Sequence, residues 1–338
     1  MLTGKGIYLW QIRHTLGGDP EKIAEAVSDA GMSHVWMKVA DGPGRYNIDP
    51  QGKDLVPELI EELGKRGIAC WGWQYVYGRY PELEAQRAVQ RINELDLDGF
   101  VVNAEGEYKS AGADNARTYM RELRRGAPNL LIGLSSYRFP RLHATFPFDA
   151  FLEYCDFNAP QVYWMGAHNS ADQLRACIQE YAQYAGTFPR PVFPTGAAYS
   201  EYGWRPSVAE VVAFMDATRD LKLSGFNFWE MRNCLINMPE VWQAISDWSG
   251  FQIPTPDPGD PATPEPTGLM GQVLTDYVNI RTGPSTGFGD VGDLLHGEEK
   301  EILDVAGSDA WVKINSDPER WVAAEHRGTR YLRITRKD

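Results

Sequence analysis

One short segment of the sequence places a carboxylate where a buried acid would be costly. Residues 99–108 read GFVVNAEGEY, which shows the period of two that is typical of a β-strand. The alternation puts Val101, Asn103 and Glu105 on one face, with the two polar side chains at the strand end. Burying a carboxylate there is costly unless it is paired or used. Glu105 is therefore a candidate catalytic acid, with a structural ion pair as the alternative.

Polar and aromatic side chains also end other β-type runs. Asp41 follows HVWMKVA and Glu230 follows FNFW. Six of the 11 tryptophans lie in or at the ends of such runs: Trp10, Trp36, Trp71, Trp73, Trp164 and Trp229. Indole rings have flat apolar faces that suit the C–H faces of sugars, although core packing is the alternative for each one. Carboxylates beside such rings suit glycoside hydrolysis, in which one carboxyl group protonates the leaving oxygen and a second stabilises or attacks the anomeric carbon.

The elements that must position these groups repeat along the chain. Eight β-type runs are visible, at 6–13, 34–42, 68–78, 99–108, 130–139, 157–164, 191–199 and 225–231. Helix-like segments separate them, and the strand starts advance by about 31 residues, the length of a βα unit. The pattern predicts an α/β fold of the (β/α)8 TIM-barrel type, with catalytic groups at the carboxyl ends of the strands. A doubly wound sheet is the alternative, but no Gly-x-Gly-x-x-Gly follows the first run.

A change in composition divides the 338 residues into two domains. Residues 254–267 read PTPDPGDPATPEPT, which has no large apolar side chain and is typical of an extended spacer. We therefore expect a barrel over 1–252, a Pro-rich linker over 253–268 and a second domain over 269–338.

The strand-end motifs of the barrel resemble those of glycoside hydrolase family 25, the lysozyme-like muramidases that cleave peptidoglycan. Residues 38–42, KVADG, resemble that family's Lys-Ala-Thr-Glu-Gly, and residues 103–105, NAE, resemble its Asp-x-Glu, whose Glu is the general acid. Residues 133–137 and 229–230 fall where the family has a Gly-x-Tyr-type strand and a Trp-Gln pair. The family 18 chitinases are a neighbouring possibility, although the full Asp-x-x-Asp-x-Asp-x-Glu run is missing.

Two carboxylates that the family 25 resemblance implies are replaced, by Tyr8 and Asn103. Asn103 can still form hydrogen bonds but supplies no charge. The resemblance implies Glu105 as general acid/base, with Asp41 or Glu230 as the second carboxylate. The residues expected to bind the sugar are Tyr8, Trp10, Lys38, Trp73, Asn103, Tyr137, Gln161, Tyr163, Trp164 and Trp229.

The second domain carries a longer motif. Residues 275–285 read TDYVNIRTGPS, followed by VGDL and AWVKI, and they resemble the bacterial SH3 (SH3b) signature. Short β-type runs separated by Gly-Pro and Ser-Thr-Gly turns predict a small all-β barrel, with its last strands in residues 322–334. The resemblance implies a module that binds cell-wall peptides, and a plain spacer or dimerisation module is the alternative.

Composition limits the function further. With 33 basic and 46 acidic residues the net charge is -13, so the chain has no broad cationic surface for nucleic acid. No apolar run of about 18 residues is present, so we expect no membrane span. Cys70, Cys155, Cys177 and Cys234 are widely spaced, which favours buried thiols over a metal site, and we expect no cofactor.

Three functions remain open. They are a glycosidase that cleaves a cell-wall polysaccharide, a catalytically degenerate carbohydrate-binding barrel, and a glycosidase for a different amino-sugar polymer. We expect the protein to be a monomer. The start MLTGKG has no signal-peptide pattern, and three alternatives stay open: a cytoplasmic location, export of the phage-lysin kind, or a leader that lies outside this sequence.

Overall fold

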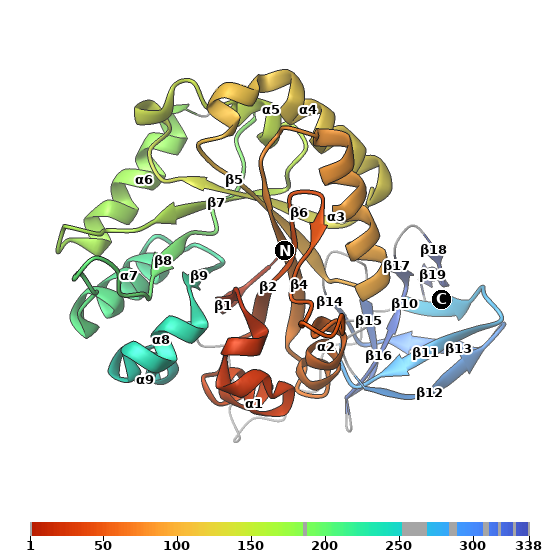
Figure 1. Ribbon diagram of the computed structural model, residues 1–338. Helices are drawn as coiled ribbons and strands as arrows, with labels where there is room; N and C mark the ends of the chain where they lie inside the picture. The colour runs from red at the N-terminus through yellow and green to blue at the C-terminus, as the bar shows by residue number, and fades with distance from the viewer. Residues whose placement is uncertain are drawn as a thin grey trace. The chain divides into compact units, whose positions relative to one another are not determined.

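The computed structural model describes residues 2–184, 188–251, 269–283, 289–306, 311–316, 319–326 and 329–336. The described residues fall into two compact units (Figure 1), of which the first comprises Leu2–Leu63 and Ile68–Phe251 and the second includes the chain from 269 onward. The expected linker at 253–268 lies outside the described residues.

Parallel strands in the first unit close into a barrel. They are β1 (Gly4–Leu9), β2 (His34–Asp41), β4 (Ala69–Val76), β5 (Gly99–Ala104), β6 (Leu131–Tyr137), β7 (Phe157–Val162), β8 (Thr195–Ala197) and β9 (Gly225–Trp229). Strand β1 pairs in parallel with both β2 and β9, which closes the sheet. The short β3 (Gly44–Arg45) folds back on the end of β2. The predicted TIM-type barrel is confirmed.

Helices connect the strands and cover the barrel. They are α1 (Pro20–Asp29), α2 (Val56–Gly64), α3 (Pro81–Leu95), α4 (Tyr108–Gly126), α5 (Phe148–Leu152), α6 (Ser170–Tyr184), α7 (Val208–Asp220), α8 (Met231–Asn237) and α9 (Pro239–Asp247), with 3-10 turns η1 (Ile12–His14), η2 (Leu16–Gly18) and η3 (Pro140–His143). Capping residues in the local sequence determine where several of these helices begin. Ser207 and Glu210, for example, form a reciprocal capping box at α7. No helix in the described part of the chain is both long and apolar enough to cross a membrane.

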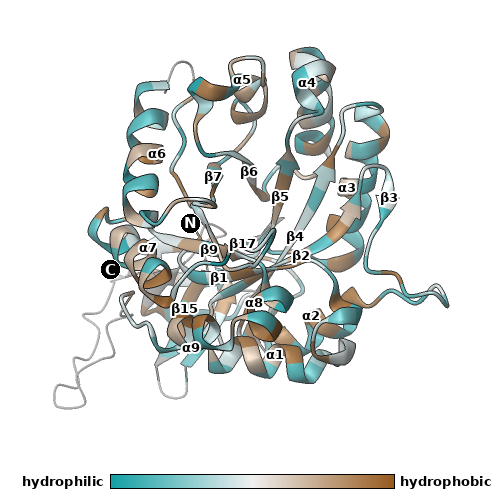
Figure 2. Cartoon of the chain, turned by 60° about the vertical axis from the view of Figure 1, so that its left-hand side comes forward, coloured by the Kyte–Doolittle hydropathy of each residue, from teal (hydrophilic) through white to brown (hydrophobic). Residues whose placement is uncertain are grey.

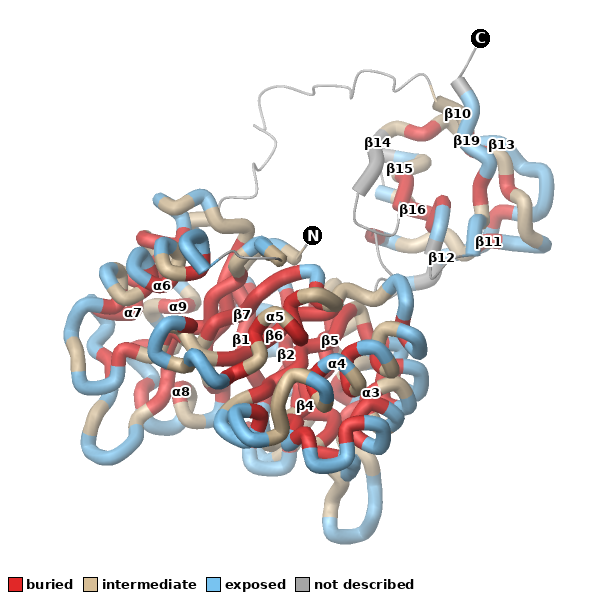
Figure 3. Tube along the Cα trace, turned by 90° about the horizontal axis from the view of Figure 1, so that it is seen from above, coloured by how far each residue is buried: buried red, intermediate tan, exposed pale blue. Residues whose placement is uncertain are grey.

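Two sets of apolar residues build the barrel unit. Strand residues that face outward, such as Phe100, Val102 and Ala104, pack with the helices. The inward set is mostly aromatic and contains Tyr8, Trp36, Trp71, Trp73, Val101, Phe157, Ala159 and Phe193. Figure 2 shows hydrophobic colour along the strands and mixed colour on the helices, and Figure 3 shows the buried residues gathered along the strands.

The structure corrects several predicted strand ends. The first strand stops at Leu9 because the chain turns into η1, and the last stops at Trp229 because Met231 begins α8. The predicted strand at 191–199 shrinks to β8, since Pro191 and Pro194 have no N–H group to give to a ladder.

The second unit is all-β, as predicted. Its strands are β10 (Leu269–Val273), β11 (Tyr277–Arg281), β12 (Asp290–Leu295), β13 (Glu299–Ile302), β14 (Asp304–Ala306), β15 (Trp311–Ser316), β16 (Glu319–Ala323), β17 (Glu325–His326), β18 (Thr329–Arg330) and β19 (Leu332–Arg336). They form antiparallel sheets around a small core that includes Val278, Val312 and Val322. Pro284 and Ser285 of the SH3b signature lie outside the described residues.

One buried lysine joins the first strand of the barrel unit to its last helix. The Nζ atom of Lys5 donates to the carbonyl oxygens of Ile245, Ser246 and Trp248 at 2.7, 2.9 and 2.9 Å, at the carboxyl end of α9. A cation there also interacts favourably with the helix dipole.

We expect Lys5→Met to lower the free energy of unfolding of the barrel by about 2 kcal/mol, because three carbonyl groups lose their donor. Lys22→Met, whose side chain is 67% exposed, should cost less than about 0.5 kcal/mol. Urea unfolding of the full chain, followed by tryptophan fluorescence, measures both. Equal stability of the two variants would contradict this role for Lys5.

Candidate active site

A cavity of about 500 Å³ opens at the carboxyl ends of the barrel strands. Its lining includes Tyr8, Trp10, Lys38, Trp73, Tyr75, Asn103, Glu105, Ser135, Gln161, Tyr163, Tyr199, Ser200, Glu201, Trp229, Glu230, Arg232 and Asn233. This is the end at which TIM-barrel enzymes carry their active sites, and the volume suits a small ligand or a few sugar rings. The structure therefore brings together most of the side chains that the sequence nominated.

The carboxylate of Glu105 is held from one side by amide groups. Its Oε1 atom accepts from Asn103 Nδ2 at 3.2 Å and from Gln161 Nε2 at 3.0 Å. The same Gln161 nitrogen lies 2.9 Å from Asn103 Oδ1 and 3.4 Å from the Ser135 hydroxyl. Within the described residues, no side chain or backbone group donates to Glu105 Oε2. One carboxylate oxygen is thus oriented, and the other is available to a ligand.

Aromatic rings form the floor and one wall of the cavity. Tyr8 meets Trp36, Trp73 and Trp229 edge-on, with ring centroids 5.0, 5.7 and 5.3 Å apart. Burial is the main cause of a raised pKa for the Tyr8 phenol, which keeps it protonated. Above it, the rings of Trp10 and Trp229 lie 6.0 Å apart with their planes tilted by 32°.

Exposure separates the tryptophans that a sugar can reach from those that it cannot. Trp10 is 39% exposed and Trp229 is half-buried, so both present ring surface to the cavity. Trp36 and Trp71 lie deeper, fill the barrel interior and do not line the cavity. Trp164 is fully buried against Trp204 and Phe214 on the helix side of the barrel, so the structure places it in the core and not in a sugar site.

Asp41 and Glu230, the two candidates for a second carboxylate, both have hydrogen-bond or ion-pair partners within the protein. Asp41 does not line the cavity. Its Oδ1 atom lies 3.3 Å from Lys38 Nζ and accepts from the Tyr77 hydroxyl at 3.1 Å. Burial lowers the pKa of Lys38, and the charge of Asp41 opposes that effect. The structure does not bring Asp41 to Glu105.

Glu230 does line the cavity, but it also caps a helix. Its Oε1 atom accepts from the backbone N–H of Asn233 at 2.7 Å, and its Oε2 atom accepts from that of Arg232 at 3.2 Å, at the start of α8. Burial raises the pKa of Glu230, and these N–H groups and the Arg232 charge oppose the rise. Both oxygens are therefore fixed in place.

Tyr137 lies beside the cavity and does not line it. Its ring stacks on that of His143, with centroids 3.6 Å apart, and Lys109 Nζ lies 4.8 Å from the Tyr137 ring. The pKa of the Tyr137 phenol is raised, mainly by burial and further by the charges of Glu105 and Glu107. Among the described residues, no group of three or more His, Cys, Asp or Glu side chains is arranged to hold a metal ion.

Several cavity residues were not nominated from the sequence. Tyr75 and Ser135 have the inward parity of their strands, so the alternation could have found them. Tyr75 also donates its hydroxyl to Glu107 at 2.8 Å. The others are Tyr199, Ser200 and Glu201, in the loop after β8 where no periodic signal exists, and Arg232 and Asn233, in the first turn of α8.

We expect Trp10→Ala to weaken the binding of a chitin oligosaccharide about tenfold, because it removes an exposed ring face at the cavity wall. Tyr184→Ala, at the end of α6 and away from the cavity, should leave the affinity unchanged. Isothermal titration calorimetry measures both affinities. An undiminished affinity of the Trp10 variant would remove this ring from the sugar site.

Comparison with known proteins separates the two units. Residues 276–326 match the bacterial SH3 domain family. The second unit contains a bacterial SH3 domain. No curated protein matches the chain.

Solved structures resemble the barrel. A chitinase from Chromobacterium violaceum aligns with a TM-score of 0.55 at 11% identity, over 74% of this chain and 99% of that one. A class V chitinase from Nicotiana tobaccum gives 0.53 at 11%, over 72% and 98%. The PgaB glycoside hydrolase domain from Bordetella bronchiseptica gives 0.52 at 12%, over 73% and 98%. At these identities the likeness establishes a shared fold alone.

The neighbouring chitinase motif can now be compared residue by residue. Asp98 and Glu105 stand at the first and last acidic positions of the Asp-x-x-Asp-x-Asp-x-Glu run, whereas Val101 and Asn103 replace the two middle ones. Asp98 accepts from the backbone N–H of Cys70 at 2.7 Å, at the amino end of β5. It therefore has a structural role, and Glu105 is the acid of this run that reaches the cavity.

Proposed function

We propose that the barrel is a glycoside hydrolase that cleaves a bacterial cell-wall glycan of the peptidoglycan type, with Glu105 as general acid/base. One observation carries this proposal. Glu105 projects into an aromatic cavity at the carboxyl ends of the strands, where one of its oxygens is held by two amides and the other is free for a ligand. The resemblance of the strand-end motifs to the lysozyme-like muramidases supports the substrate class.

The contacts of Glu105 support two proposed tasks. Asn103 and Gln161 fix the orientation of the carboxyl group, so that Oε2 faces the space where a glycosidic oxygen would lie. In the first step the protonated carboxyl group gives its proton to the leaving oxygen, and in the second the carboxylate removes a proton from the attacking water. Trp10 and Trp229 stack on the flanking sugars.

Glu230 fits an electrostatic role better than a nucleophilic one. Both of its oxygens accept backbone N–H groups of α8, so neither is free to attack the anomeric carbon. Its negative charge can still stabilise the positive character that develops on the sugar ring. The nucleophile of the first step is then the substrate's own N-acyl group, as in substrate-assisted glycosidases, and water attacks in the second step.

The bacterial SH3 domain would raise the local concentration of the barrel on the wall. The Pro-rich sequence of residues 254–267 suits such tethering. A net charge of -13 gives no attraction to an anionic wall, so adhesion would depend on this domain and on ring stacking. We also propose that the protein acts as a monomer.

A second function is favoured by Asn103 and by the fixed oxygens of Glu230. With a single free carboxylate in place of a poised pair, the barrel could bind a glycan without cleaving it. Such a protein would bind wall fragments measurably and release no product from them.

The release of reducing ends from purified peptidoglycan and from chitin oligomers tests the proposal. We expect the full chain to release reducing ends from peptidoglycan. Activity on chitin alone would assign the enzyme to a different amino-sugar polymer. Binding of both glycans with no release from either would favour the non-catalytic barrel and contradict the proposed hydrolysis.

A further inference from the structure

A second hollow, of about 250 Å³, lies beside the 3-10 turn η1. Its lining comprises Gln11, Arg13, His14, Arg45, Tyr46, Asn47, Ile48 and Leu55, and we call it the η1 groove. None of these lining residues is acidic, although the whole chain carries a net charge of -13.

The groove is next to the catalytic cavity, because one segment forms a wall of each. Trp10 lines the cavity, and Gln11 lines the groove. Arg232, which lines the cavity, donates from Nε to the His14 carbonyl at 3.2 Å. Lys38 Nζ, also in the cavity, lies 4.3 Å from the centre of the Tyr46 ring. The cavity and the η1 groove are therefore neighbours.

Buried hydrogen bonds hold one wall of the groove in place. The Asn47 side chain accepts from the Ile12 N–H at 2.9 Å and donates to the carbonyls of Lys38 at 2.8 Å and Trp10 at 3.1 Å. Asn47 has a φ of 56°, in the left-handed region that Asn tolerates better than most residues. These bonds fix η1 against the end of β2.

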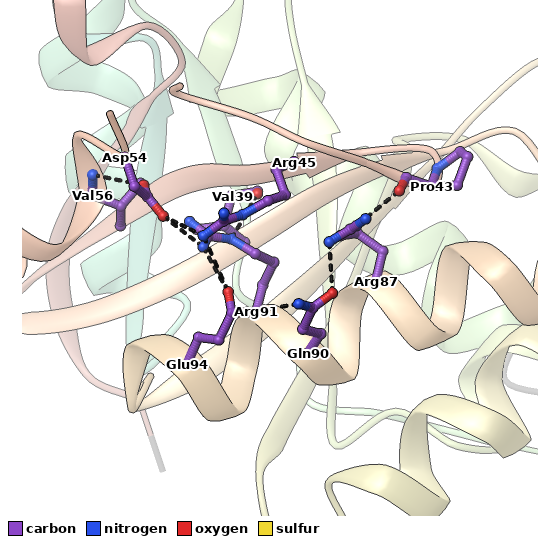
Figure 4. A network of polar contacts seen from close by, with 9 residues as sticks. All are labelled: Val39, Pro43, Arg45, Asp54, Val56, Arg87, Gln90, Arg91 and Glu94. Carbon is purple, nitrogen blue, oxygen red and sulfur yellow. Dashed lines mark hydrogen bonds and ion pairs between the residues drawn. The ribbon is translucent and has the colours of Figure 1, made fainter. Parts of the chain in front are cut away.

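An arginine network holds the other wall (Figure 4). Asp54 Oδ2 accepts from Arg45 at 2.9 Å and from Arg91 at 2.7 Å, and Glu94 Oε2 accepts from the same two guanidinium groups. Two carboxylates thus face two guanidinium groups. The charge of Arg45 is compensated inside the network, and the groove wall is preformed.

Two other arginines of this region form no ion pair with a carboxylate of the described residues. Arg13 Nη2 contacts His14 Nε2 at 3.0 Å, and no carboxylate of the described residues lies within ion-pairing distance of Arg13. Arg232 forms no such ion pair in the described part of the chain either, although its charge acts on the nearby Glu230, where burial raises the pKa of the carboxyl group and the Arg232 charge opposes that rise. Both side chains are exposed. His14 joins them, since its ring contacts Arg13 and its carbonyl contacts Arg232.

We propose that the η1 groove is a subsite for a carboxylate-bearing substituent of the glycan, with Arg13 as its principal ligand and Arg232 at the passage from the cavity. Guanidinium groups bind carboxylates in bidentate fashion, and free ones at a preformed wall suit that purpose. The inference rests on the proposed function for the position of the scissile bond. An acidic sugar ring or an acidic group attached to an amino sugar would present the same chemistry.

Calorimetry on the full chain tests the subsite without the need for catalysis. The ligands are soluble peptidoglycan fragments, the same fragments with their carboxyl groups amidated, neutral chitin oligomers, and polygalacturonate oligomers. We expect Arg13→Gln to weaken binding of the carboxylate-bearing glycan about tenfold and to leave the affinities for the amidated fragments and for chitin unchanged. Arg175→Gln, an exposed arginine on α6, is the matched control and should change no affinity.

The four ligands distinguish the two origins of the carboxylate, and they separate the subsite from the proposed hydrolase function. A loss confined to peptidoglycan fragments assigns an acidic group on an amino sugar, and a loss confined to polygalacturonate assigns an acidic sugar. If Arg13→Gln weakens acidic and amidated fragments equally, or if the wild-type chain binds them equally, the subsite is wrong. Selective loss of acidic-glycan binding in a protein that hydrolyses nothing would keep the subsite and contradict the proposed function alone.

Discussion

Glu105→Gln is expected to lower the rate of reducing-end release from peptidoglycan by about 100- to 10,000-fold, the range found when a general acid/base is lost. The glutamine has the size of the glutamate and can still accept from Asn103 and Gln161, but it has no proton to give to the leaving oxygen. Glycan affinity should change much less than the rate. Initial rates and calorimetric affinities of the same preparation separate the two effects.

Glu107→Gln is the matched control, two residues along the same strand end. Glu107 is exposed, accepts from the Tyr75 hydroxyl and does not line the cavity, so this variant should keep most of the activity. Full activity of the Glu105 variant, or equal losses in the two, would contradict the assignment of the acid.

Arg91→Ala is expected to cost about 3–5 kcal/mol in the free energy of unfolding of the barrel. The Arg91 side chain is wholly buried and donates to the Val39 carbonyl at 3.2 Å, to Asp54 at 2.7 Å and to Glu94 at 3.0 Å (Figure 4). Its removal leaves the buried Val39 carbonyl with the Tyr46 N–H alone and leaves Asp54 and Glu94 with one guanidinium partner fewer, in addition to an empty volume. Urea unfolding monitored by tryptophan fluorescence gives the value.

Arg87→Ala, on the same helix α3, provides the comparison. Arg87 is partly exposed and contacts the Pro43 carbonyl and Gln90, so its loss should cost less than about 1 kcal/mol. A loss of the same size in both variants would show that the buried network does not stabilise the barrel as described.

The barrel and Glu105 were predictable because strand alternation is a local property. A period of two tells which side chains face inward, and in β5 it correctly separates Val101 and Asn103 from their outward neighbours. It does not tell how deep along the barrel axis a residue lies. Trp36 and Trp73 have the same parity, yet Trp73 lines the cavity and Trp36 packs beneath it.

Departures from regular strands account for the rest. A shift in the pairing of β2 with β4, between Lys38 and Ala40, sets Asp41 opposite Tyr75, and Asp41 then bonds to Tyr77 and Lys38. Glu201, in the loop after β8, and Arg232, in the first turn of α8, reach the cavity through tertiary folding, which leaves no periodic mark in the sequence. The pairing of Arg91 with Asp54 likewise joins segments 37 residues apart, whereas Glu94 lies one turn along the same helix as Arg91.

Glu105 as the general acid is tested most directly by a crystal structure of the E105Q variant with a bound peptidoglycan oligosaccharide. We predict a glycosidic oxygen within about 3.2 Å of the side-chain amide at position 105, with sugar rings against Trp10 and Trp229. An oligosaccharide that binds elsewhere, or that occupies the cavity with no glycosidic oxygen near position 105, would contradict it.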